Sequence, residues 1–269
     1  MLEITDLSHS YGPPDRAHLA LDQVSLRVAD GELVSIVGPS GCGKSTLLRC
    51  AAGLLTPAAG TVRLDGARVD RVPDGLAVVF QDYSRSLLPW LSVRDNVALP
   101  LRRTGQRRPA RRAVASAALA TVGLPDTGDR YPWQLSGGMQ QRVAIARALA
   151  CGPRLLLMDE PFGSVDAQTR EDLEDLLLAV RQQRDITIML VTHDIDESVY
   201  VGDRVVVLTQ SPGRIRADLP VSLPAPRDQI STRELAAFVQ LRATVGRLVR
   251  TPGPGRPARS AAARPGTAP

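Results

Sequence analysis

One glycine-rich octet constrains this chain more than any other feature. Residues 38–45 read Gly-Pro-Ser-Gly-Cys-Gly-Lys-Ser and fit the pattern G-x-x-x-x-G-K-[ST]. The apolar run Leu33–Val37 before it predicts a buried strand, and Ser45–Ala52 after it has helical spacing and ends at Gly53. A glycine-rich turn before an ordinary helix is the alternative interpretation. Strand, loop, lysine and helix together favour a phosphate-binding loop.

The residue types of this loop suit phosphate. Glycines let successive backbone N–H groups turn towards the phosphates, and the helix N-terminus adds positive potential. Lys44, the only lysine among 33 Lys and Arg residues, supplies a point charge, and Ser45 is expected to hold Mg²⁺. Cys42 is expected to contribute only its backbone N–H. The predicted contacts come from Gly38, Pro39, Ser40, Gly41, Cys42, Gly43, Lys44, Ser45 and Thr46.

Two acids end a second buried strand. The run Leu155-Leu-Leu-Met-Asp-Glu160 places Asp159 and Glu160 at a strand end. Alone, such a pair is commonly a turn or helix boundary. Beside a phosphate loop, we expect Asp159 to bind Mg²⁺ through its water shell and Glu160 to polarise an attacking water.

The order of apolar runs predicts an α/β fold with a parallel sheet. Between about Asp82 and Ala150, helical patterns replace the β-branched runs, which indicates a helical insertion. Expected strands are Leu2–Leu7, Val24–Val28, Leu33–Val37, Thr61–Leu64, Leu76–Phe80, Leu155–Met158, Thr187–Val191 and Arg204–Leu208. Expected helices besides Ser45–Ala52 are Ala110–Val122, Met139–Ala150, Ala167–Gln182 and Thr232–Val249. The Pro-, Ala- and Arg-rich end, residues 251–269, is expected to be disordered.

A second glycine pair can also face an anion. Leu135-Ser-Gly-Gly-Met-Gln-Gln-Arg142 sets a serine and two glycines before a helix, whose N-terminus can present N–H groups. From the residues alone, an N-capping serine followed by a flexible turn is an equal alternative.

Together, this octet, the phosphate loop and Met158-Asp-Glu-Pro-Phe162 resemble the ATPase subunits of ATP-binding-cassette (ABC) transporters. The resemblance covers residues 1 to about 220. It implies ATP and Mg²⁺ as cofactors, and a phosphate-loop NTPase (RecA-like) core with an antiparallel β subdomain and an inserted α-helical subdomain over about 82–150. A helical extension over 221–250 would follow. In that family, Ser136, Gly137 and Gly138 match the positions that contact ATP bound to the other subunit of a head-to-tail homodimer.

The resemblance assigns further site residues. Gln81 matches the Q-loop glutamine, a nucleotide and metal contact, and His193 the switch histidine, catalytic together with Glu160 and Lys44. Tyr11 matches the aromatic that stacks on adenine, for which a ring face is well suited. Gln140 lies in the octet 135–142, which matches the signature motif of that family, and Asp166 matches the D-loop aspartate. Here Gly163-Ser-Val-Asp166 departs from the usual Ser-Ala-Leu-Asp but keeps small and apolar side chains.

A longer stretch after Gln81 is similar to importer ATPases for nitrate, sulfonate, taurine and bicarbonate. These carry Leu-Leu-Pro-Trp after the Q-loop, as at 87–90 here, and Ser211-Pro-Gly-Arg-Ile215 is similar as well. The resemblance implies integral-membrane permease subunits, an extracytoplasmic solute-binding protein, and a place at the cytoplasmic face of the membrane. The apolar residues of 87–91 would form either a groove for a permease helix or the core of the helical subdomain.

Charge and composition narrow the alternatives. The net charge of +5 is spread along the chain, and no aromatic residues interleave the arginines of the C-terminal end, so no nucleic-acid partner is expected. Arginines at 102, 103, 107, 108, 111 and 112 face either lipid headgroups or solvent. The N-terminus lacks a secretory pattern, and three cysteines without CxxC spacing suggest neither disulfides nor zinc. An exporter or envelope-remodelling ATPase, and a soluble ABC-type switch, remain alternative functions.

Overall fold

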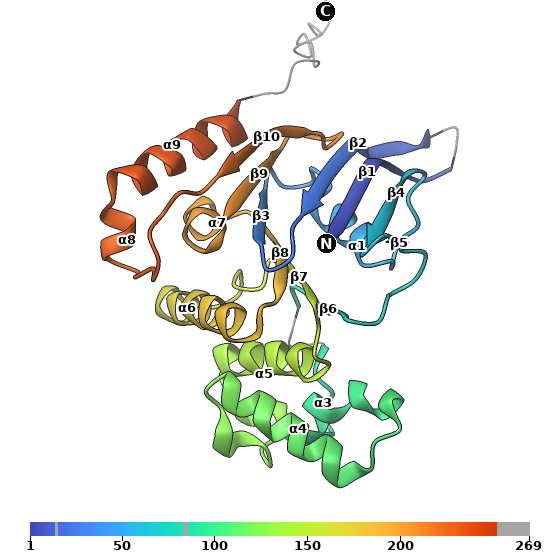
Figure 1. Cartoon of the computed structure of the whole chain (residues 1–269), viewed down its shortest axis with the longest axis vertical. Helices are drawn as coiled ribbons and strands as arrows, with labels where there is room; N and C mark the ends of the chain where they lie inside the picture. The colour runs from blue at the N-terminus through green and yellow to red at the C-terminus, as the bar shows by residue number, and fades with distance from the viewer. Residues whose placement is uncertain (14–15, 83–85, 252–269) are drawn as a thin grey trace, which may run out of the picture.

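The computed structural model describes residues 1–13, 16–82 and 86–251. Two β-sheets and a set of helices are arranged around two apolar cores (Figure 1). One sheet has six strands in the order β10-β9-β3-β8-β7-β6, and the other has four in the order β2-β1-β4-β5. The predicted α/β class, with a parallel core sheet, an antiparallel sheet and inserted helices, is confirmed.

The six-stranded sheet is parallel except at one edge. Its parallel members are β3 (Leu33–Val37), β6 (Leu76–Val79), β7 (Leu155–Asp159), β8 (Thr187–Thr192) and β9 (Arg204–Leu208). The edge strand β10 (Ile215–Pro220) runs antiparallel to β9. Strands buried on both faces read as continuous apolar runs, which is why the sequence indicated them so clearly. Because their carboxyl ends share one edge of the sheet, the residues that follow them come together there.

The antiparallel sheet lies beside the phosphate loop. It contains β1 (Leu2–Tyr11), β2 (His18–Val28), β4 (Ala59–Leu64) and β5 (Ala67–Arg68). Both β1 and β2 are longer than predicted, because bulges let them continue through polar residues; Asp6, at φ 48°, lies at a register shift. Helix α1 (Lys44–Ala51) packs in the core shared by the two sheets.

The residues between β6 and β7 form helices, and among those described no strand interrupts them. They are α3 (Val93–Ala98), α4 (Arg108–Thr121) and α5 (Gly137–Ala150), with short 3₁₀ turns at Pro100–Thr104, Pro125–Thr127 and Pro132–Gln134. These helices make up the lower part of the molecule in Figure 1, below the sheets. The predicted bounds of a separate subdomain remain a prediction.

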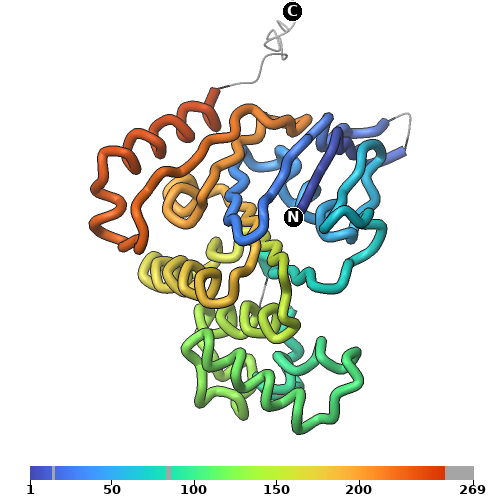
Figure 2. Tube along the Cα trace, viewed as in Figure 1, coloured from blue at the N-terminus to red at the C-terminus, as the bar shows by residue number. Residues whose placement is uncertain are grey.

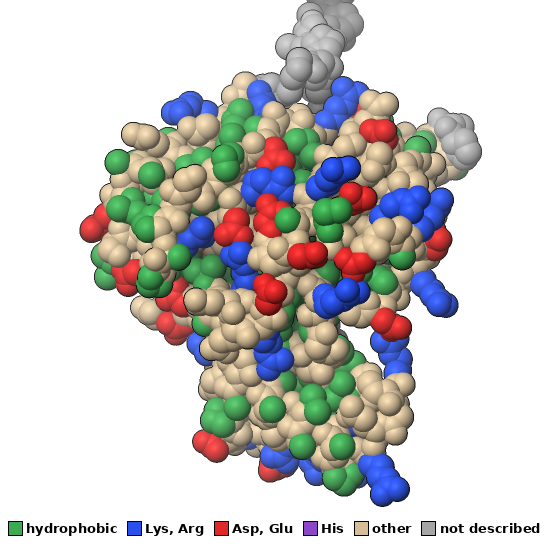
Figure 3. Space-filling view, in the orientation of Figure 1, with side chains coloured by type: hydrophobic (Ala, Val, Ile, Leu, Met, Phe, Trp, Pro, Cys, Tyr) green, Lys and Arg blue, Asp and Glu red, His purple; other side chains and the backbone are tan. Residues whose placement is uncertain are grey.

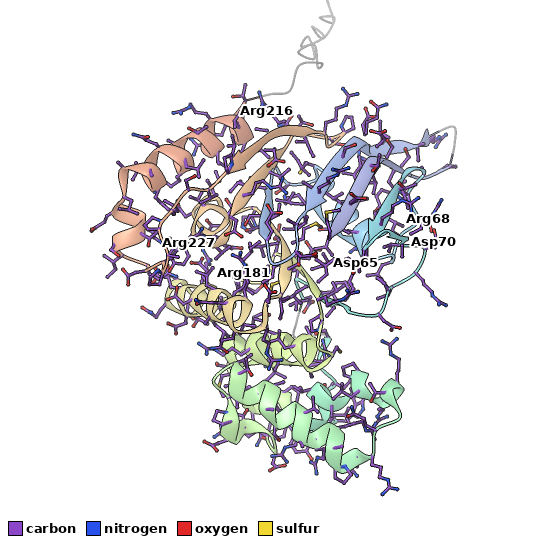
Figure 4. All side chains as sticks on the ribbon, viewed as in Figure 1. Asp65, Arg68, Asp70, Arg181, Arg216 and Arg227 are labelled. Atoms are coloured by element: carbon purple, nitrogen blue, oxygen red, sulfur yellow. The ribbon has the colours of Figure 1, made fainter. Side chains whose placement is uncertain are left out.

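Helices α6 (Ala167–Arg184) and α7 (Ile195–Val201) flank the six-stranded sheet, and the C-terminal part of the chain folds back onto them. Figure 2 shows the trace beyond β10 returning along the side of the molecule. Arg227 donates to the carbonyl oxygen of Tyr200 at the end of α7, and Arg181 of α6 donates to Asp203 (3.0 Å). Figure 4 labels both arginines, which come from distant parts of the chain and lie near α7.

The single helix predicted over Thr232–Val249 is wrong in one respect. It is divided into α8 (Ser231–Glu234) and α9 (Ala236–Arg250) by Leu235, which is extended (ψ 134°). The buried Thr232 hydroxyl accepts a hydrogen bond from the Asp228 amide, and Arg233 is held by Glu174 of α6. A new helical start then allows Phe238 and Val245 to reach the core. The predicted disorder of 251–269 concerns residues that, from 252 onwards, lie outside the described part of the chain.

Candidate nucleotide site

The glycine-rich loop joins β3 to α1 in a conformation that requires glycine. Gly41 and Gly43 have positive φ values of 76° and 99°. A Cβ at Gly43 would lie 2.7 Å from Leu21 and 2.8 Å from the carbonyl oxygen of Ala20. The β2 backbone thus closes over the loop from one side. In this conformation the loop can present its backbone N–H groups to a ligand, whereas a side chain at Gly43 would clash with β2.

Lys44 spans this loop. Its side chain is buried, and its ammonium donates to the carbonyl oxygens of Gly38 (2.8 Å) and Pro39 (3.3 Å). Cys42 is buried too, and burial raises the pKa of its thiol while the Lys44 charge opposes this shift. A thiol held neutral in this way suits the predicted backbone-only role of Cys42.

Ser45 and Asp159 meet at the carboxyl edge of the parallel sheet. The Ser45 hydroxyl donates to a carboxylate oxygen of Asp159 at 3.0 Å, and Asp159 is 5% exposed. Burial raises the pKa of Asp159, the Ser45 hydrogen bond lowers it, and the Glu160 charge raises it again. The hydroxyl of Ser45 and the buried carboxylate of Asp159 offer oxygen ligands of the kind that Mg²⁺ prefers. Among the described residues, no group of three or more His, Cys, Asp or Glu side chains is placed to bind a metal ion.

Glu160 is the meeting point of three strand ends. One of its carboxylate oxygens accepts from Gln81 Nε2 (2.9 Å), after β6, and lies 3.1 Å from Nδ1 of His193, after β8. The glutamate itself follows β7, with a positive φ of 44° that is unusual for a residue with a Cβ. Its amide donates to the carbonyl oxygen of Val191. Glu160 and His193, two of the three predicted catalytic residues, are therefore in contact, and the predicted metal contact Gln81 lies against the same carboxylate oxygen.

Tyr11 and Thr46 are brought together at the other end of the loop. The Tyr11 hydroxyl and the Thr46 hydroxyl are 3.1 Å apart, and the His9 ring meets the Tyr11 ring edge-on with centroids 4.8 Å apart. Tyr11 is 41% exposed. An exposed ring fixed on one edge beside a phosphate loop is a suitable platform for a base.

The second glycine pair lies elsewhere. Ser136 caps α5, accepting from the Met139 amide at 3.3 Å, and Gln140 Nε2 donates to the carbonyl oxygens of Pro132 (3.0 Å) and Leu135 (3.3 Å). In the described residues, no hydrogen bond joins Ser136, Gly137 or Gly138 to the phosphate loop. Figure 1 places α5 well apart from α1. Within one chain, the two predicted phosphate contacts do not form one site.

Asp166 caps α6, and a contact that the sequence did not predict joins this helix to α5. Asp166 accepts from the Thr169 amide (2.9 Å) and hydroxyl (2.7 Å), bonds that lower the pKa of its carboxyl. A Cβ at Gly138 would lie 2.3 Å from the Thr169 methyl group, so glycine lets the two helix starts approach. Thr169 was missed because only the capping pattern Asp-x-x-Thr hinted at its position.

This chain is similar in sequence and in structure to known proteins. The family model described as "ABC transporter" matches residues 21–163. The nitrate import ATP-binding protein NrtD of Synechocystis sp. is 44% identical over 232 residues, which are 86% of this chain and 86% of that protein. The taurine import ATP-binding protein TauB of Sinorhizobium fredii is 49% identical over 214 residues, 80% of this chain and 79% of that protein. A dimeric, post-hydrolysis structure of the ATP-binding cassette MJ0796 with ADP and Pi has a TM-score of 0.73 at 33% identity, covering 82% of this chain and 99% of that one.

Proposed function

Because this chain belongs to the ABC transporter family, we propose that it hydrolyses ATP to drive import of a small anion, such as nitrate, taurine or another aliphatic sulfonate. The family resemblance of the motifs is thereby confirmed, and so is ATP binding by a cassette ATPase. The choice of nitrate or taurine as the transported solute rests on the similarity of this chain to import proteins for these two solutes. The observation that carries the catalytic part is the Glu160 carboxylate, which Gln81 and His193 both contact.

We assign the chemistry residue by residue. Lys44 and the loop amides hold the phosphates, and Tyr11 stacks on the base. Ser45, Asp159 and Gln81 would hold Mg²⁺, which neutralises phosphate charge when bound. Glu160 takes the proton of the attacking water, and His193 orients that carboxylate. The side chain of His193 is 57% exposed, so it can also face the γ-phosphate.

The complete site requires a second copy of the chain. Ser136, Gly137, Gly138 and Gln140 are rigidly held at the start of α5, apart from their own phosphate loop. A head-to-tail homodimer would bring them to the partner's ATP, and Asp166 would lie at the contact between subunits. The dimeric arrangement of the similar cassette MJ0796 supports this proposal.

The partners are proposed as permease subunits at the cytoplasmic face of the membrane and, through them, a solute-binding protein. No helix in the described ranges is long and apolar enough to span a bilayer. The apolar stretch after Gln81 divides between the two alternatives raised by the sequence: Leu87 is 2% exposed and belongs to the core, whereas Trp90 is 69% exposed. Trp90 is therefore the proposed permease contact. On the face shown in Figure 3, basic and acidic side chains are interspersed.

An uptake experiment tests the transport function. The chain is co-expressed with candidate permease and solute-binding subunits, in cells that lack their own anion importers. We expect uptake of labelled nitrate or taurine with the wild type and none with Lys44→Ala, which loses charge-assisted phosphate contacts and about 10- to 100-fold in ATP affinity. ATP-dependent efflux of the anion instead of uptake, or tight duplex binding without permease association, would contradict the proposal.

A further inference from the structure

Two aromatic side chains stand exposed directly before the Ser136 turn. Tyr131 is 40% exposed and Trp133 is 70% exposed. Their rings are stacked, with centroids 6.0 Å apart and an interplanar angle of 16°. Trp133 has one of the largest exposed fractions among the apolar side chains of the described residues, and the function proposed above does not use it.

The backbone that carries these rings is fixed relative to Ser136. The Tyr131 amide donates to the side-chain oxygen of Gln134 (2.8 Å), and the Gln134 amide donates back to the Tyr131 carbonyl oxygen (2.9 Å). The Gln140 side chain then ties Pro132 and Leu135 to the first turn of α5. The ring pair and the Ser136 turn therefore move as one unit, and an exposed ring on a fixed support loses little entropy when it binds.

The position of the pair limits what can cover it. Only two residues lie between Trp133 and Ser136, so their Cα atoms are at most about 10 Å apart. If Ser136 contacts the γ-phosphate of the partner's ATP, the rest of that nucleotide must extend over nearby surface. An indole offers a flat apolar face for a sugar or a base, and such stacking tolerates any base.

We propose that Trp133, backed by Tyr131, contacts the nucleoside part of the ATP held by the partner subunit's phosphate loop. This inference rests on the head-to-tail dimer proposed above. Each nucleoside would then lie between an aromatic of its own subunit, Tyr11, and an aromatic of the other. The chain's own nucleotide is excluded because α5 and α1 lie apart (Figure 1).

The chain contains only two tryptophans, so fluorescence isolates the proposed contact. One subunit carries Trp90→Phe and Lys44→Ala; Trp133 is its only indole, and its own phosphate loop is disabled. Its partner carries Trp90→Phe, Trp133→Phe and Glu160→Gln, and binds an ATP with a fluorescent group on the ribose. We expect energy transfer from Trp133 to this nucleotide and protection of Trp133 from acrylamide quenching. The matched control keeps Trp90 and replaces Trp133 by Phe, and weaker transfer is expected from it.

Affinity provides a second readout. In the Glu160→Gln background, Trp133→Ala should raise the ATP concentration for half-maximal dimerisation by about 5- to 10-fold, and Trp133→Phe should restore most of this loss. A dimer in which Trp133 stays as accessible to acrylamide as in the monomer would overturn this inference and leave the proposed function standing. Failure of the Glu160→Gln chain to dimerise with ATP would overturn both.

Discussion

At the scale of single residues, the site depends on where strands end. Gln81, Glu160 and His193 follow three neighbouring parallel strands, and one oxygen of Glu160 contacts both other side chains. The positive φ of Glu160 turns its side chain into this position at a cost of about 1–3 kcal/mol in backbone strain. Backbone strain at this one residue is the reason to propose that the direction of the Glu160 carboxylate matters for function.

Glu160→Gln should abolish ATP turnover and leave ATP binding intact. The amide has nearly the shape of the carboxylate but cannot take a proton from water, and general-base catalysis contributes roughly 10²–10⁴-fold in rate. Phosphate release measures turnover, and gel filtration with ATP should show a trapped dimer. Glu171→Gln, the same change on α6 away from this edge, serves as the control. Turnover at the wild-type rate in Glu160→Gln would remove Glu160 from the proposed mechanism.

At the scale of elements, the loop before α3 shows what the sequence could and could not predict. The phosphate loop was predictable because its residues are contiguous and its conformation depends on glycine. The sequence could not predict that Leu87 is buried while Trp90 is exposed, because the conformation of this loop depends on Asn96. This buried amide donates to the carbonyl oxygens of Leu88 (3.0 Å), Leu91 (3.1 Å) and Ser92 (3.1 Å), and accepts from the Leu88 amide (2.8 Å). No local pattern marks an asparagine that organises a loop preceding it.

Asn96→Ala should destabilise the protein by about 2–3 kcal/mol, because buried backbone groups of this loop lose their partners. The change is measured as a lower urea midpoint, together with a shift in the emission of Trp90, which the loop carries. Gln240→Ala removes an exposed amide on α9 and should leave the midpoint unchanged. An equal midpoint for Asn96→Ala and the wild type would show that water replaces the four hydrogen bonds without cost.

The break at Leu235 has a similar explanation. Helical periodicity continues through 232–249, so the sequence favoured one helix. The interruption is imposed by partners far away in sequence: Arg233 binds the carboxylate of Glu174 on α6 (2.8 Å) and lies over the Tyr200 ring at 5.1 Å from its centroid. Gln229 donates to the same Glu174 carboxylate (3.2 Å) and to Asp175 (2.9 Å). Tertiary contacts of this kind override local propensity.

At the scale of the whole molecule, the contact of Arg233 and Gln229 with Glu174 joins the C-terminal segment to the α/β core. We expect this contact to make the stability of the protein depend on pH. Glu174 is 1% exposed; burial raises its pKa to about 7, and Arg233 and Gln229 oppose the shift. The folded carboxyl keeps its proton up to about pH 7, whereas the unfolded one releases it near 4.5. Stability is therefore lost as the pH rises from 4.5 through 7, by roughly 3 kcal/mol at most.

Glu174→Gln should remove this part of the pH dependence. Urea unfolding at about pH 4.5 and about pH 8 should show the variant losing less stability than the wild type over that interval. Arg233→Met should have the opposite effect, because it removes the charge that favours the ionised carboxylate. Parallel curves for wild type and Glu174→Gln would mean that folding does not raise the pKa of Glu174.

The separation of Ser136 from the phosphate loop leads to a test in which two inactive chains restore each other. Ser136→Ala keeps its own loop and Glu160 but spoils the signature that it offers to its partner. Glu160→Gln keeps its signature but cannot hydrolyse the ATP on its own loop. In a mixed head-to-tail dimer, the loop of the first faces the signature of the second, and this one site has every assigned group.

Mixing the two variants should therefore raise ATPase activity severalfold above that of either variant alone. The gain should depend on total protein concentration, because it requires association. A chain carrying both Ser136→Ala and Glu160→Gln, mixed in the same ratio with either single variant, offers no intact site and should show no gain. If crosslinking detects mixed dimers and their activity stays at the level of the separate variants, Ser136 does not complete its partner's site. The contacts around α5 would then have to act within one chain, across the separation that the fold sets between α5 and α1.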